Sequence, residues 1–247
     1  MKTIVVWFSC GAASAVAAKK IIEKYGKDHI VRIVNNPIKE EHEDNKRFLD
    51  DCEKWLGVKI ESAINSLYPS CSIYDVFNKK KYISGIYGAP CTQELKKKAR
   101  QQWEENNPHD YIVLGFTFEE KNRHDRFILT ERNNVIPVLI DQGITKDECK
   151  RILLSEGIKL PEIYSLGFNN ANCIGCVKST GVGYWQNVRK KFPEQFNKMC
   201  ETSRRIGCRL IKYKGNRIFL DELPIDAIGG KQKKNIECGI FCEEDQQ

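Results

Sequence analysis

TIVVWF at Thr3–Phe8, followed by SCGAAS at Ser9–Ser14, is the stretch that decides the fold. The first segment is rich in β-branched and aromatic residues and predicts a buried strand, and the small residues after it predict a tight loop. Apolar residues at helical spacing then predict a helix over Ala13–Tyr25 that ends at Gly26. This order is typical of the first unit of a parallel α/β sheet.

Strands and helices go on alternating along the next part of the chain. The predicted elements are strands over 30–34, 58–60, 111–114 and 136–140, and helices over 41–56, 91–105 and 145–155. We expect Gly115–Arg126 to be a polar loop. The pattern predicts an α/β, Rossmann-like fold whose mostly parallel sheet carries helices on both faces.

The rest of the chain is expected to form an appendage to this core. It comprises a Cys-containing irregular segment over 169–183, a helix over Pro193–Ile206, a hairpin over 209–220 that turns at Lys214–Asn216, and a polar tail with two cysteines. We therefore predict a nucleotide-binding core over residues 1–168 and an appended region over 169–247.

The composition excludes several classes of protein. The chain has 247 residues, of which 41% are hydrophobic and 30% charged, and no apolar run approaches the length of a membrane-spanning helix. The apolar start could be interpreted as a signal peptide, but its Ala-rich part continues into Lys19, Lys20 and Glu23, which favours a helix inside a domain. The prediction is a cytoplasmic protein without a membrane partner.

The cysteine count indicates metal or redox chemistry and the net charge an anionic partner, but neither identifies the metal or the partner. Eleven cysteines, an odd number, fit metal or redox chemistry in a reducing compartment better than a disulfide scaffold. The net charge of +7 is compatible with a nucleotide, a nucleic acid or an acidic protein as partner. The lysine runs at 79–81 and 96–98 favour solvated faces over a nucleic-acid groove, and we expect Lys96 to lie on the surface.

The loop after the first strand has the features of an anion site. It leads into a helix N-terminus, where backbone N–H groups and the helix dipole favour negative charge. Gly11 permits close backbone approach, and Ser9 and Ser14 offer hydroxyl groups. The alternative is an ordinary tight turn between a strand and a helix, which also prefers small residues.

In its context this loop resembles the phosphate-binding loop of the PP-loop superfamily, whose usual form is Ser-Gly-Gly-x-Asp-Ser. Ser9, Gly11 and Ser14 match that form, Cys10 replaces the first glycine, and Ala13 replaces the aspartate. Because the family associates the aspartate with magnesium and pyrophosphate, the resemblance argues against ATP cleavage. It favours the phosphoadenosine phosphosulfate reductase branch, which also lacks that aspartate.

The resemblance to that reductase family extends over most of the chain. Gly115–Arg123 is similar to the family segment Gly-Ile-Arg-x-x-Glu-Ser-x-x-Arg, with Thr117 in place of the first arginine. The order of Pro137–Asp141, Leu160-Pro161, Tyr164–Phe168 and Cys173–Cys176 resembles the family block that ends in C-x-x-C, and Glu237–Phe241 resembles its C-terminal Glu-Cys-Gly-Leu-His with Phe241 in place of His. The residues expected to bind an adenosine nucleotide are Ser9, Cys10, Gly11, Ser14, Glu120, Arg123 and Arg126.

The C-x-x-C of Cys173 and Cys176 lets two thiolates converge on one metal. Cys91 opens a helix, and the resemblance to adenylyl-sulfate reductases implies that it joins the pair in holding a 4Fe-4S cluster beside the Gly11 loop. The fourth ligand could be Cys242, Cys238 or Cys10, or one iron could stay open. Zinc is the competing metal, and three unrelated cysteines are the remaining alternative.

The resemblance also implies that Cys238 is the catalytic nucleophile. Its thiolate would attack the sulfur of an adenosine sulfonucleotide, and a thioredoxin-like thiol donor would then release sulfite. Nearby lysines could favour the thiolate. Because Cys242 follows four residues later, the two cysteines could instead ligate the metal or form a redox pair.

Three functions follow from this reading. The first is an oxidoreductase that acts on the sulfur of a sulfonucleotide. The second is a PP-loop sulfur transferase acting on DNA or tRNA, which the positive charge and the altered tail motif favour and Ala13 disfavours. The third is a nucleotide-binding accessory protein without catalysis. A homodimer is an open possibility for each.

Overall fold

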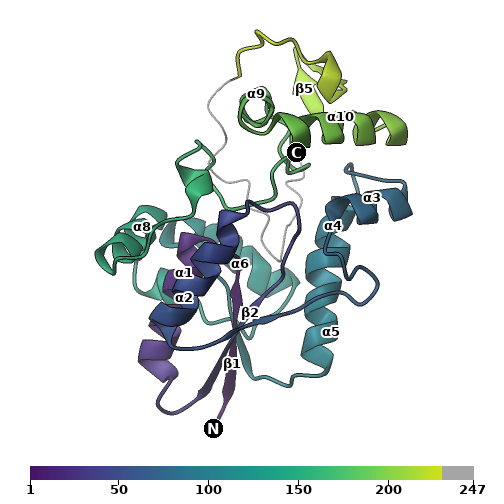
Figure 1. Ribbon diagram of the computed structural model, residues 1–247. Coiled ribbons are helices and arrows are strands. Elements are labelled where there is room, and N and C mark those ends of the chain that lie inside the picture. Colours follow the sequence, from purple (N-terminus) through teal and green to yellow (C-terminus); the bar gives the residue numbers. More distant parts are fainter. Residues whose placement is uncertain (230–247) are drawn as a thin grey trace. The chain divides into compact units, whose positions relative to one another are not determined.

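The computed structural model describes residues 1–229, which fold as two compact units built from interleaved segments (Figure 1). The sheet unit comprises Met1–Pro37, Glu43–Ala63 and Arg100–Glu162, and the helical unit comprises Ile38–His42, Ile64–Ala99 and the chain from Ile163 onward. This division differs from the predicted boundary at residue 168. The reason is that apolar residues of the 64–99 segment pack in the core of the helical unit instead of against the sheet.

The sheet unit contains a parallel sheet of four strands in the order β3-β2-β1-β4. The strands are β1 (Thr3–Phe8), β2 (Ile30–Asn35), β3 (Ile60–Ser62) and β4 (Tyr111–Val113). An isolated parallel bridge between Ile112 and Val135 extends the sheet beyond β4. The α/β, Rossmann-like fold expected from the sequence is confirmed.

Helices cover both faces of this sheet, as the alternating side chains of β1 require. The helices are α1 (Ala12–Tyr25), α2 (Asp44–Leu56), α5 (Ala99–Glu105), α6 (Lys121–Thr130), α7 (Val138–Asp141) and α8 (Lys146–Ser155). Successive strand residues point to opposite faces. Trp7 accordingly packs edge-on against Trp103 of α5 at 5.6 Å, whereas Phe8 stacks on Phe48 of α2 at 6.2 Å.

Two elements of the sheet unit differ from the sequence prediction. The expected polar loop Gly115–Arg126 contains the 3-10 turn η2 (Phe118–Glu120) and the start of α6, because Thr117 and Glu120 form a capping box that begins a helix. The expected strand over 136–140 is the short helix α7, preceded by Pro137. Only Val135 keeps strand pairing there.

The helical unit consists of short helices around an apolar cluster. Its elements are α3 (Ile73–Lys80), α4 (Pro90–Thr92), the π-helical turn η1 (Gln93–Lys98), α9 (Val182–Lys191), α10 (Pro193–Ile206), the hairpin β5 (Ile211–Tyr213) with β6 (Asn216–Ile218), and the 3-10 turns η3 (Glu162–Tyr164) at its border and η4 (Leu220–Glu222). The hairpin turn is confirmed at Lys214 and Gly215, which have φ values of 46° and 85°. The fully buried Trp185 lies in the cluster and donates its indole N–H to the carbonyl of Ser179.

No helix in residues 1–229 is both long and apolar enough to span a lipid bilayer.

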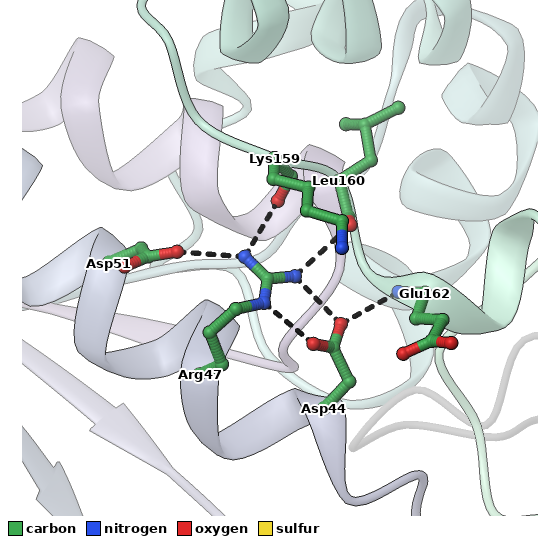
Figure 2. A network of polar contacts seen from close by, with 6 residues as sticks. All are labelled: Asp44, Arg47, Asp51, Lys159, Leu160 and Glu162. Carbon is green, nitrogen blue, oxygen red and sulfur yellow. Dashed lines mark hydrogen bonds and ion pairs between the residues drawn. The ribbon is translucent and has the colours of Figure 1, made fainter.

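A network of charges ties α2 to the last segment of the sheet unit (Figure 2). Arg47 donates to both carboxylate oxygens of Asp44, at 2.6 and 2.7 Å, and to Asp51 at 2.8 Å. The same guanidinium donates to the carbonyls of Lys159 and Leu160, at 3.1 Å each. One side chain thus fixes a loop more than a hundred residues away in sequence.

Asp44 completes this network by accepting the backbone N–H of Glu162 at 2.7 Å. Hydrogen bonds from Arg47, opposed by burial and assisted by the Glu162 amide, lower the pKa of Asp44 to about 2. Since the pKa is depressed in the folded state, the stabilisation is complete above the unfolded pKa of about 3.9 and is lost as the pH falls toward 2.

We predict that Asp44→Asn lowers the free energy of unfolding at pH 7 by about 1–3 kcal/mol, because charge-assisted hydrogen bonds are lost. The deficit relative to the wild-type protein should shrink between pH 4 and pH 2. Urea unfolding across this pH range measures it, with Asp50→Asn, an exposed residue of the same helix, as the control. A deficit that stays constant down to pH 2 would contradict the assignment.

Candidate functional site

The loop between β1 and α1 is held by one hydroxyl group. Ser14 Oγ accepts from the backbone N–H of Ser9 at 3.1 Å and from Ser9 Oγ at 3.2 Å, and it donates to the carbonyl of Gly11 at 2.9 Å. Gly11 is the N-cap residue of α1 and has an extended conformation. Within the described helix, the first turn of α1 carries no acidic residue. The helix N-terminus therefore keeps the positive potential that an anion prefers.

Cys10, which replaces a glycine of the PP-loop form that the sequence resembles, takes the left-handed conformation. Its φ is 53°, its side chain is buried, and Asn35 Nδ2 donates to its sulfur at 3.7 Å. The same amide donates to the carbonyl of Phe8 at 2.8 Å. The end of β2 thus holds the loop in a shape that glycine adopts at lower cost.

Gly115 brings the segment after β4 against the first turn of α1. A Cβ atom on Gly115 would lie 2.9 Å from the backbone nitrogen of Ser14 and 3.1 Å from the carbonyl carbon of Ala13. β4 follows β1 in the sheet on the side opposite to β2, so the strand order reverses between β1 and β4. In open parallel sheets ligands bind outside the carboxyl ends of the strands at such a reversal.

Glu120 and Arg123 belong to the same segment. Glu120 accepts from the N–H and the hydroxyl of Thr117, at 3.2 and 3.3 Å, and from Arg123 at 2.6 Å. The Arg123 guanidinium lies 5.2 Å from the ring centre of Phe116, the residue after Gly115. The structure therefore joins these two predicted residues to the Gly115 segment, whereas Arg126 is exposed one turn further along α6.

Two buried polar residues of this unit were not identified from the sequence. Asn36 donates to the carbonyl of Ala63 at 2.9 Å, and among residues 1–229 its buried Oδ1 has no hydrogen-bond donor. His124 packs on Phe116 at 5.8 Å, and its buried Nε2 has no partner in the described chain either. Asn36 follows β2 at the carboxyl edge of the sheet. The only sequence signal for it was an Asn-Asn-Pro turn.

The C-x-x-C turn of the helical unit closes around the hydroxyl of Tyr184. This hydroxyl accepts from the N–H of Cys176 at 2.7 Å and donates to the carbonyl of Cys173 at 3.3 Å. Gly175 has a φ of 78° and lies against the Trp185 ring, so the turn needs glycine there. Burial holds the pKa of Tyr184 well above its ordinary value, which keeps the hydroxyl a donor.

The predicted metal ligands are distributed as follows. Cys173 and Cys176 are buried, and half-buried Cys91 packs against the apolar cluster that contains Cys173. Within residues 1–229 no three His, Cys, Asp or Glu side chains are close enough to hold a metal ion. Cys238 and Cys242 lie outside the described residues. Because Cys10 belongs to the sheet unit and the other three to the helical unit, the expected gathering beside Gly11 stays a prediction.

The remaining cysteines divide into two groups. Cys52, Cys149 and Cys200 are buried, and desolvation raises the pKa of their thiols to about 12, 12 and 11, so they pack as small apolar side chains. Cys71 and Cys208 are only partly buried. Burial also raises the pKa of both thiols.

The expectation that Lys96 lies on the surface is wrong. Its side chain is buried, and its ammonium nitrogen lies 4.0 Å from a carboxylate oxygen of Glu41. Lys96 lies in the π-helical turn η1, where three consecutive residues, Glu94, Leu95 and Lys96, are buried. A sequence pattern of ordinary α-helical period does not anticipate such a turn.

Comparison with known proteins gives little beyond these observations. No model of a protein family matches the chain, and no curated protein matches it. Among solved structures that match, one is the U34-tRNA thiolase NcsA from Methanococcus maripaludis with its [4Fe-4S] cluster, with a TM-score of 0.44 and 13% sequence identity over 83% of this chain and 72% of that chain. At this level of similarity the match carries no functional argument.

We predict that Gly115→Ala lowers the free energy of unfolding by about 1–3 kcal/mol, because the added methyl group meets backbone atoms that have no room to yield. If the loop binds an adenosine nucleotide, as proposed below, calorimetry should show weaker binding by this variant. Gly181→Ala is the control, since its Cβ would lie in open space and ordinary backbone geometry. Equal stability and equal binding in the two variants would contradict the close approach at Gly115.

Proposed function

We propose that this protein is an enzyme that binds an adenosine nucleotide at the carboxyl ends of β1 and β4 and acts on the sulfur of a sulfonucleotide. The observation that supports it best is the close approach of Gly115 to the first turn of α1, beside the loop that the Ser14 hydroxyl holds by hydrogen bonds. An anion at this place would face the helix N-terminus, with Arg123 on the adjoining segment. Buried Asn36 Oδ1 offers an acceptor to a ligand N–H group at the same edge.

The proposed reaction is a two-step reduction by thiols. The Cys238 thiolate attacks the sulfur of the sulfonucleotide, an S–S bond forms, and the S–O bond breaks with its electron pair leaving on the nucleotide phosphate. A dithiol of the thioredoxin type then attacks the resulting S-sulfocysteine, sulfite leaves, and the dithiol is oxidised to a disulfide. Ala13 fits this reaction, which needs no ATP cleavage.

We predict that the purified protein releases sulfite from adenylyl sulfate or its 3′-phosphate in the presence of reduced thioredoxin, and that Cys238→Ser abolishes this release because serine is not a nucleophile at neutral pH. Free sulfite is measured with a dye that reacts with sulfite and not with thiols. Cys149→Ser, at a buried position on α8, is the control that should keep activity. Release that persists in Cys238→Ser would remove this residue from the mechanism.

We further propose that Cys91, Cys173 and Cys176, with Cys242, hold a 4Fe-4S cluster, zinc being the alternative. The C-x-x-C turn supports this proposal, because it holds Cys173 and Cys176 in a conformation fixed by Tyr184 and Gly175. When bound, a cluster would supply a redox-active centre. The chain's own contribution is the fixed turn and the apolar surroundings that exclude water.

Metal analysis after anaerobic purification tests this ligand set. We predict iron and sulfide in the wild-type protein and their loss in Cys173→Ser, because one thiolate ligand is removed. Cys149→Ser should keep the wild-type metal content. Zinc in place of iron would select the alternative metal, and a metal-free wild-type protein would refute the site.

A second candidate function is sulfur transfer onto a nucleic acid, and the distribution of charge favours it. The sheet unit has 19 Lys and Arg against 20 Asp and Glu, whereas the described part of the helical unit has 18 against 9. An excess of positive charge over a whole unit attracts a polyanion such as a nucleic acid. A small nucleotide needs only a few charges at its own site. Sulfur incorporation into tRNA or DNA without sulfite release would select this candidate.

A further inference from the structure

Part of the excess charge of the helical unit lies at the end of α3 and on η1. Four exposed lysines form what we term the lysine face: Lys79, Lys80, Lys81 and Lys98. They come from two segments of chain that a buried carboxylate joins. Lys80 and Lys98 both bind the same oxygen of Glu94, at 2.8 and 3.0 Å.

The ion pairs on this face leave it strongly positive. Glu94 is a single carboxylate, with its side chain 4% exposed, and it serves two ammonium groups. Although burial opposes its ionisation, the hydrogen bonds from both lysines lower the pKa of Glu94, so it stays charged at neutral pH. Lys79 lies 5.2 Å from the ring centre of Tyr68, and Lys81 ends α3 in the left-handed conformation. The Glu94 pairs therefore organise the face without neutralising it.

An exposed apolar tip lies in the chain between Lys81 and Lys98. Ile86 and Tyr87 are 80% and 82% exposed, and they lie in a turn closed by backbone hydrogen bonds between Gly85 and Gly88. One hydrogen bond from a distant segment holds this turn: the Ser84 carbonyl accepts from Cys208 Sγ at 3.4 Å. An aromatic ring is thus presented to solvent from a fixed support.

We propose that the lysine face and the Tyr87 tip bind an unpaired segment of RNA. Lysine ammonium groups neutralise backbone phosphates, and an exposed aromatic ring stacks on a base. Only unpaired bases offer a face to such a ring, and RNA presents them in loops and bulges. Two apolar side chains on a turn lack the broad apolar face by which an amphipathic helix binds membranes.

This inference goes beyond the nucleotide site and does not rest on it. If the second candidate function is correct, the surface would hold the RNA that receives sulfur. If sulfonucleotide reduction is correct, RNA binding is a separate property. A binding assay without nucleotide or thiol therefore separates failure of this proposal from failure of the proposed function.

The test uses the full-length protein and a fluorescein-labelled, unstructured 20-nucleotide RNA, with anisotropy measured from 50 to 300 mM salt. We expect Lys79→Gln/Lys81→Gln to lower the slope of log K against log salt by about 1.4, since each phosphate contact to a single strand contributes about 0.7. Tyr87→Ala should weaken binding by about 5- to 150-fold with little change in slope, because it removes stacking and no charge. Neither variant touches Glu94.

The matched control is Lys24→Gln/Lys27→Gln in the sheet unit. Lys24 is exposed and lies 5.1 Å from the Tyr25 ring, as Lys79 lies on Tyr68, so equal charge is removed from an equivalent setting. An equal loss of slope in this control would overturn the assignment of the surface. Equal affinity for single-stranded DNA, for duplex DNA or for vesicles of anionic lipid would overturn the choice of RNA, as would failure of the wild-type protein to bind at 50 mM salt.

Discussion

The close approach of two backbones at Gly115 is the constraint on which the sheet unit depends. The turn after β4 can lie against the first turn of α1 only because no side chain separates them. The Ser14 hydroxyl then fixes the loop from the other side by accepting from Ser9 and donating to Gly11. Loop, helix terminus and neighbouring strand end become one rigid corner. A rigid corner lined by backbone N–H groups costs little reorganisation when an anion binds.

The loop and helix of this corner are formed by consecutive residues, which explains why the sequence pattern could identify them. A β-branched run followed by small residues predicts a strand, a tight loop and a helix, and the structure has all three, with the helix starting one residue earlier than expected. The Thr145 cap and the Lys214-Gly215 turn were predictable for the same reason, since a capping box and left-handed residues are local signals. Where the determinants of a turn, cap or helix are local, its own residues are enough to predict it.

Other features depend on tertiary contacts and could not be predicted. The segment after Val135 has the composition of a strand, yet it pairs at one residue and then turns into α7. Lys96 is buried, with its ammonium nitrogen 4.0 Å from a carboxylate oxygen of Glu41, a residue 55 positions away that no local pattern connects to it. The orphan acceptor of Asn36 and the hydroxyl of Tyr184 in the C-x-x-C turn become visible only when neighbouring segments are in place. Cys238 and Cys242 lie outside the described residues, so their roles rest on the sequence alone.

The interleaving of the two units has an evolutionary consequence. The chain passes from one unit to the other at five positions, so neither unit corresponds to one continuous stretch of gene. Recombination cannot exchange the helical unit as a cassette, because residues 64–99 are encoded between strands of the sheet. Diversification of this architecture has to proceed by substitution and by growth of loops, and both units must be inherited together.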